Sequence, residues 1–130
     1  MSSKKIMAGI FVFLVLLGSA TGARAQQNNR LTRLAKIVVD SAQLDSYNRF
    51  LKEEIETSVR AEPGVLTLYA VADKSKPTHI TILEIYADSA AYRSHLLTPH
   101  FKKYKAGTAA MVMQLELTPV TPLVPDMKIK

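Results

Sequence analysis

Alternating and helically spaced apolar residues divide the chain into a strand, a helix, two more strands, a second helical region and a final strand. Apolar residues alternate with polar ones, or run together, in four segments that we expect to be strands: Leu31–Val39, Val65–Val71, His79–Tyr86 and Met111–Thr118. The polar connection from Asp73 to Pro77 has hairpin length, so the second and third strands should pair antiparallel.

The first predicted helix follows Asp40 or Ser41, either of which can cap it. One stripe of side chains recurs there at helical spacing: Leu44, Tyr47, Leu51, Ile55 and Ser58. Pro63 and Gly64 should end this helix, because Pro cannot continue the hydrogen-bond ladder and Gly tolerates a turn. The helix is therefore amphipathic and should lie on a flat apolar surface.

The second helical region contains Thr98-Pro99. A Pro at the first helical position after a Thr cap begins a new helix comfortably. We therefore expect two pieces, over 88–97 and 99–106, with Asp88 or Ser89 capping the first and Gly107 ending the second.

The resulting order, β-α-β-β-α-β, predicts a ferredoxin-like α+β fold: a four-stranded antiparallel sheet with its helices on one face. Alternation places Leu66, Leu68 and Ala70 on one face of the second strand and Val65, Tyr69 and Val71 on the other. In the last strand one face carries Met111, Met113, Leu115 and Leu117. Both faces of the sheet are thus apolar, and an uncovered apolar face favours association. We expect a homodimer that packs sheet against sheet.

The beginning of the chain has the pattern of a secretory signal peptide. Lys4 and Lys5 precede the apolar run 6–17, and Ala23-Arg24-Ala25 supplies small residues before a cleavage point after Ala25. This divides the chain into a signal peptide (1–25), a domain (26–121) and a tail (122–130). An uncleaved anchor is the alternative; with cleavage we expect an exported protein, periplasmic or secreted, without stable membrane association.

Composition narrows the chemistry. The 130 residues include no Cys, which excludes disulfides, thiolate chemistry and a lipoprotein anchor. The 17 basic residues fall to 14 once three are removed with the signal peptide, against 11 acidic ones, so the net charge falls from +6 to +3. The one basic cluster, Lys102, Lys103 and Lys105, comes without a groove-reading motif, so we expect no nucleic-acid partner.

Three segments resemble the antibiotic biosynthesis monooxygenase family, which includes quinol monooxygenases. They are Glu62-Pro63-Gly64-Val65-Leu66, the strand Ile82-Leu83-Glu84-Ile85-Tyr86, and Ala91-Tyr92-Arg93-Ser94-His95-Leu96-Leu97-Thr98-Pro99-His100-Phe101. The resemblance covers about Leu34 to Leu117. It implies a dimeric α/β barrel with a pocket between sheet and helices, and oxygenation of electron-rich aromatics without cofactor or metal.

Such oxygenation needs a base to deprotonate a phenol and donors for the developing oxygen anion. His95 is the expected base, Glu84 its partner, and Tyr69, Tyr86 and His100 the expected donors. The residues expected to bind substrate are Tyr86, Tyr92, Phe101 and Met113.

Other interpretations stay open for these residues. His100 is also ordinary at a helix start, the Tyr and Met side chains also suit a core or interface, and Glu84 also suits an ion pair across a dimer. A metal site on Glu84, His95 and His100 would need three groups to converge by folding alone, so we expect no metal. A related heme-degrading branch has a His ligand where this chain has Lys105, which disfavours heme. The second functional class is a dimer that binds a small hydrophobic ligand without catalysis.

Overall fold

The structure, a computed structural model, describes residues 29–124. The predicted signal peptide and the last residues of the predicted tail, 125–130, lie outside the described residues. The elements are β1 (Leu31–Val39), a short 3-10 helix η1 (Ser41–Gln43), α2 (Leu44–Ala61), β2 (Val65–Ala72), β3 (His79–Tyr86), α3 (Ser89–Leu96), α4 (Pro99–Thr108) and β4 (Val112–Pro119). The predicted ferredoxin-like order is confirmed, and so is the division of the second helical region into two.

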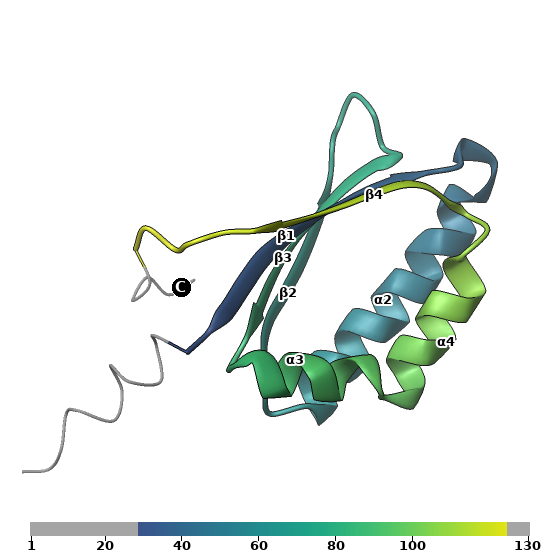
Figure 1. Cartoon of the computed structure of the whole chain (residues 1–130). Coiled ribbons are helices and arrows are strands. Elements are labelled where there is room, and N and C mark those ends of the chain that lie inside the picture. Colours follow the sequence, from purple (N-terminus) through teal and green to yellow (C-terminus); the bar gives the residue numbers. More distant parts are fainter. Residues whose placement is uncertain (1–28, 125–130) are drawn as a thin grey trace, which may run out of the picture.

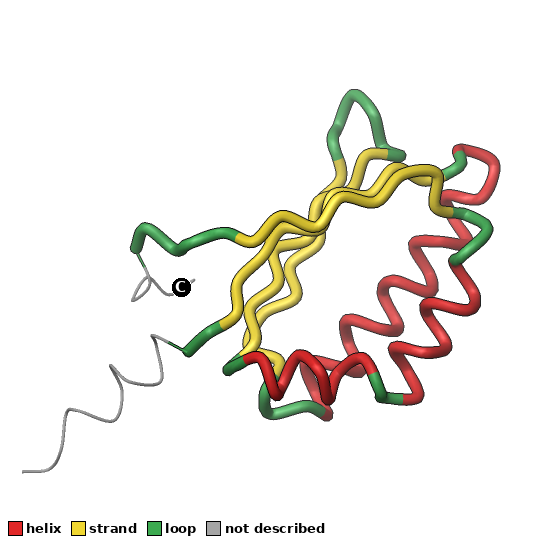
Figure 2. Tube along the Cα trace, viewed as in Figure 1, coloured by secondary structure: helices red, strands yellow, loops and turns green. Residues whose placement is uncertain are grey.

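The four strands form one antiparallel sheet in the order β2-β3-β1-β4. Figure 1 shows α2 and α4 side by side on one face of this sheet, with α3 running from the sheet edge to the start of α4. Figure 2 shows the same two layers, with the other face of the sheet free of helices. The helices on one face of the sheet are as predicted.

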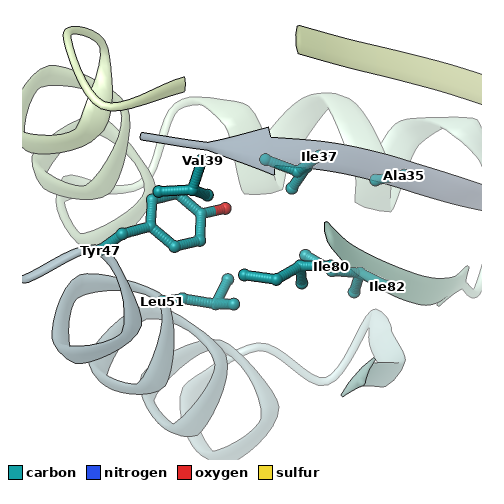
Figure 3. Close-up of a cluster of buried hydrophobic side chains, with 7 residues drawn as sticks. All are labelled: Ala35, Ile37, Val39, Tyr47, Leu51, Ile80 and Ile82. Carbon is teal, nitrogen blue, oxygen red and sulfur yellow. The ribbon is translucent and has the colours of Figure 1, made fainter. Parts of the chain in front are cut away.

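The core lies between the sheet and α2 (Figure 3). Its buried members come from three elements: Ala35, Ile37 and Val39 of β1, Ile80 and Ile82 of β3, and Tyr47 and Leu51 of α2. Strand alternation puts every second residue on this face, and the stripe of α2 meets it. The predicted apolar stripe of α2, which should lie on a flat apolar surface, is therefore confirmed.

Side-chain caps mark the beginnings of η1, α3 and α4, and α2 follows η1 directly. Asp40 accepts a hydrogen bond from the backbone N–H of Ala42 (3.0 Å), and Asp88 accepts one from Ala91 (2.7 Å). Thr98 Oγ1 accepts from the N–H of Phe101 (3.3 Å), and Pro99 follows it as the first helical residue. Each cap satisfies an amide that has no partner within its helix. These starts match the predicted ones.

The prediction that Gly107 ends α4 was wrong, because the helix continues through it to Thr108. Neither glycine among the described residues has a positive φ. A Cβ at Gly107 would collide with the ring of Phe50, and one at Gly64 would lie 2.5 Å from Cβ of Ala91. Both glycines therefore allow close approach between elements instead of serving a turn conformation.

Two register shifts changed the predicted strand faces. One lies between Val65 and Thr67, so Val65 faces Tyr86 and is buried, while Leu66 is 43% exposed. The prediction grouped Val65 with Tyr69 and Val71, whereas the shift places it on the face of Leu68 and Ala70. The second shift leaves Met113 between Val112, which pairs with Val39, and Gln114, which pairs with Val38. Met113 has no pairing partner there, so the regular alternation that grouped it with Leu115 and Leu117 is interrupted, and only the two leucines line the pocket described below.

The face of the sheet without helices carries exposed apolar side chains. Tyr69 is 58% exposed and Val71 is 49% exposed on the edge strand β2. Among residues 29–124, no helix is long and apolar enough to cross a membrane.

Candidate active site

A pocket of about 510 Å³ lies between the helix-covered face of the sheet and the helices. Its volume is within the usual range for small-molecule sites, about 300–1,000 Å³. Most of the wall is apolar, with aromatic rings from Tyr86, Tyr92, Phe101 and Tyr104. The ionisable groups in the wall are few: Arg33, Glu54, Glu84, His95 and Lys105. The pocket therefore suits a flat apolar molecule that carries a small number of polar groups.

His95 is buried in the last turn of α3 and lines this pocket. Its ring centroid lies 4.8 Å from that of Phe101 and 5.4 Å from that of Tyr86. The hydroxyl of Thr98 donates to the backbone carbonyl of His95 (2.8 Å), which holds the turn between α3 and α4. The imidazole thus has a fixed position, packed between aromatic rings.

Glu62 joins the two histidines. Its Oε2 lies 3.0 Å from Nδ1 of His95 and 2.7 Å from Nε2 of His100. Burial alone would raise the pKa of Glu62, but the hydrogen bonds from His100 and His95 outweigh burial and lower this pKa. A carboxylate can only accept hydrogen bonds, so Nδ1 of His95 is the donor in this pair. In the neutral ring, Nε2 of His95 is then left with its lone pair.

That lone pair lies near another carboxyl group, that of the buried Glu54. Oε1 of Glu54 is 3.5 Å from Nε2 of His95 and accepts a hydrogen bond from Ser58 Oγ (2.7 Å). Burial is the largest cause of the raised pKa of Glu54, although Ser58 and both histidines act in the opposite direction. His95 is therefore placed between a carboxylate with a lowered pKa and a carboxyl group that holds its proton more readily than usual.

The predicted pairing of Glu84 with His95 was wrong. Oε2 of Glu84 accepts hydrogen bonds from Arg33 Nε (2.6 Å) and from the hydroxyl of Tyr86 (3.1 Å). Arg33 lies opposite Glu84 in the β1–β3 register, which brings the two charges together on the pocket face. The guanidinium also lies 4.3 Å from the centre of the Tyr92 ring. Glu84 is a pocket residue, but its charge is already compensated within the same protomer.

The structure separates the other predicted site residues into two groups. Tyr86, Tyr92 and Phe101 line the pocket as expected. Tyr69 does not, because it pairs with Leu83 on the face of the sheet away from the helices. Met113, displaced by the register shift, does not line the pocket either. The expected contacts of Tyr69 and Met113 with a substrate in this pocket are therefore not supported within one chain.

His100 lies beside the pocket wall and contacts His95 through Glu62. It is not a wall residue itself, and its side chain is 16% exposed. Its position favours a role in holding Glu62, instead of the direct contact with substrate that we expected of a donor.

Sequence reasoning missed Arg33, Glu54 and Glu62. Two of them carried a visible signal: Arg33 alternates with Ala35 on the apolar face of β1, and Glu54 falls on the helical stripe between Leu51 and Ser58. A charged residue on a buried face indicates a paired or functional group. Glu62 gave a weaker signal, because the residue before Pro63 adopts an extended conformation whose side-chain direction the sequence does not specify.

Fold and site together define a small ferredoxin-like domain with an aromatic-lined pocket and a carboxylate–histidine pair whose histidine lines that pocket. The chain belongs to the antibiotic biosynthesis monooxygenase family, whose sequence profile matches residues 30–107. The predicted resemblance to this family is therefore confirmed.

Solved structures agree with this membership. A protein from Bacteroides thetaiotaomicron, assigned as an antibiotic biosynthesis monooxygenase, is 60% identical with a TM-score of 0.79, over 80% of this chain and 99% of its own. A protein from Lactobacillus acidophilus assigned as a monooxygenase is 30% identical (TM-score 0.70), over 72% of this chain and 44% of its own. A Nitrosomonas europaea protein, 17% identical with a TM-score of 0.69 over 75% of this chain and 93% of its own, shares the fold. No curated protein matched the chain.

Proposed function

We propose that this protein is a cofactor-independent monooxygenase that oxidises a quinol or polyphenol-like aromatic with O₂. The observation that carries the proposal is the Glu62–His95 pair, in which His95 lines the pocket and its Nδ1 is directed to the carboxylate behind it. A histidine oriented in this way offers Nε2 as a general base near neutral pH. Membership of the monooxygenase family supports the same activity class.

The chemistry follows from the substrate. A quinol that loses a hydroxyl proton becomes a strong electron donor to O₂. One oxygen atom enters the ring and the other leaves as water, so quinol and O₂ give a hydroxyquinone and water, and the quinol supplies every electron. Nε2 of His95 takes the first proton, and Glu62 stabilises the imidazolium that forms.

The remaining pocket residues bind and orient the ring. Tyr86, Tyr92 and Phe101 offer aromatic surfaces for stacking. Arg33 has five N–H donors, and its contact with Glu84 uses its Nε, so the other N–H groups remain as donors for an oxygen anion in the pocket. The apolar wall limits water around the reactive intermediate.

The proposal includes an exported homodimer. Exposed Tyr69 and Val71 make the face without helices a surface suited to a second copy of the chain. The pattern of Lys4, Lys5 and the apolar run after them supports export.

Oxygen uptake by the purified, chelator-treated protein tests the activity. With a panel of hydroquinones, uptake should exceed autoxidation, and His95→Ala should lower the rate by about 100- to 10,000-fold, the usual contribution of a general base. His79→Ala is the matched control, because His79 is an exposed histidine at the start of β3. Unchanged uptake in His95→Ala would overturn the proposed base. A wild-type protein that binds these aromatics without consuming oxygen would favour the ligand-binding alternative.

A further inference from the structure

Three side chains beside the pocket bring metal-ligating atoms together. Glu62, His95 and His100 place one carboxylate oxygen and two ring nitrogens within 4.8 Å of one another. They come from the residue that ends α2, the last turn of α3 and the first turn of α4. Two imidazoles with one carboxylate are a ligand set that Zn²⁺ takes in open sites, with a water completing the tetrahedron.

The two distances to Glu62 are somewhat shorter than in such a site, and the two ring nitrogens lie within 4.8 Å of each other. Oε2 of Glu62 lies 3.0 Å from Nδ1 of His95 and 2.7 Å from Nε2 of His100. With metal–ligand bonds of about 2.0–2.1 Å, neighbouring ligand atoms of a tetrahedral zinc site lie about 3.3 Å apart. Lengthening the distance from Glu62 to His95 by about 0.3 Å and the distance to His100 by about 0.6 Å would reach this spacing for both pairs. Hydrogen bonds hold the same atoms together without the ion.

The surroundings of His95 supply the partner that a metal-bound imidazole needs. Glu54 Oε1 lies 3.5 Å from Nε2, the nitrogen left over when Nδ1 binds a cation. Metal-ligating histidines commonly donate this second N–H to a carboxylate, which fixes the ring. Ser58 in turn holds Glu54 (2.7 Å). The second carboxyl group is therefore already in place behind the cluster.

The cluster is also accessible. The side chain of Glu62 is 14% exposed and that of His100 is 16% exposed, whereas that of His95 is 3% exposed. An ion can therefore reach the cluster from the surface without passing through the aromatic pocket, and His95 would be its innermost ligand.

We propose that Glu62, His95 and His100 bind one divalent transition-metal ion, for which Zn²⁺ is the probe, and that this ion inhibits the oxygenase. When the ion binds Nδ1, the single proton of the neutral His95 ring is carried by Nε2, which points its N–H toward Oε1 of Glu54. Nε2 then has no lone pair with which to deprotonate substrate. The inhibitory part rests on the proposed function, whereas the binding part does not.

Calorimetric titration of Zn²⁺ into the purified protein, expressed without a histidine tag and stripped with chelator, tests the site. Wild type should bind one ion per protomer. His100→Ala and Glu62→Gln should each weaken binding by more than about 10-fold, because even loss of a residue that only orients a metal ligand typically lowers metal affinity by about 10-fold or more. His79→Ala should bind Zn²⁺ as wild type does, because His79 is an exposed residue at the start of β3 and is not part of the cluster. Circular dichroism of each variant checks that it is folded.

Three results overturn parts of the proposal. Absence of saturable binding at one ion per protomer, or equal binding by folded His100→Ala, overturns the site. Oxygen uptake that is unchanged at saturating Zn²⁺ overturns the inhibition while the site stands. If the protein binds Zn²⁺ as expected but none of the quinols supports oxygen uptake, with or without chelator, the proposed function is overturned instead. Inhibition by Zn²⁺ that chelator reverses in wild type, and that His100→Ala lacks, supports both parts.

Discussion

Gly107 gives the sharpest quantitative prediction about packing. It lies inside α4, where Gly is about 1 kcal/mol less favourable than Ala. A Cβ at this position would collide with Cε1 and Cζ of Phe50 on α2. Overpacking of this kind costs about 1–3 kcal/mol. Gly107→Ala should therefore be neutral to destabilising by about 2 kcal/mol, although helix propensity alone predicts stabilisation.

The partner residue tests the cause. Phe50→Leu removes the ring atoms Cε1 and Cζ, so in that background Gly107→Ala should stabilise by up to about 1 kcal/mol. Ala106→Gly, at an exposed position of the same helix, is the control and should cost about 1 kcal/mol in both backgrounds. Urea denaturation at one protein concentration measures the free energies of unfolding of all six proteins. Equal effects of Gly107→Ala with and without the Phe50 ring would refute the packing argument.

Three further predictions concern charge and association. Arg33→Ala leaves Glu84 buried without its ion-pair partner and should lower the free energy of unfolding by about 3–5 kcal/mol, whereas Arg33→Ala with Glu84→Gln should recover part of this loss in urea titrations. Because burial raises the pKa of Glu54, the proton that the folded state favours contributes stability below the unfolded pKa of about 4.3, and this stability is lost as pH rises through the folded pKa. Glu54→Gln should therefore gain on wild type in stability as pH rises above about 4.3, and a constant difference would contradict the raised pKa. Tyr69→Asp, on the face without helices, should convert the proposed dimer into a monomer, as measured by light scattering. Lys74→Asp, at an exposed position between β2 and β3, is the control and should leave the dimer intact.

Local signals were enough to predict most of the fold. The alternation in β1 and β3 and the stripe of α2 each have one period, and Asp88, Thr98 and Pro99 mark helix starts through hydrogen bonds within three residues. Such features depend on neighbours in the sequence, which the sequence displays directly.

The features that were missed depend on distant residues. The register shift at Val65–Thr67 is set by pairing with β3, and the role of Gly107 is set by Phe50, 57 positions earlier. Periodicity within β2 or α4 carries no information about either. Helix end and close approach both favour Gly, so the residue type alone did not distinguish them.

The candidate site was predicted in part. His95, Tyr86, Tyr92 and Phe101 line the pocket, as expected from the segments that resemble the monooxygenase family. The partner of His95 was not predicted, because Glu62 follows α2 and reaches the ring only through the packing of α2 against α3 and α4. Glu84 was the nearer candidate on the strand, but Arg33 on the adjacent strand forms an ion pair with it.

The most direct test of the proposed chemistry follows the oxygen atoms. A hydroquinone that supports uptake is incubated with the protein under isotope-labelled O₂, and the product is analysed by mass spectrometry beside His95→Ala and His79→Ala. Wild type and His79→Ala should each give a hydroxyquinone that carries one labelled oxygen atom, and His95→Ala should give almost none of this product. A quinone that carries no label, formed equally by all three proteins, would contradict oxygenation at the Glu62–His95 site.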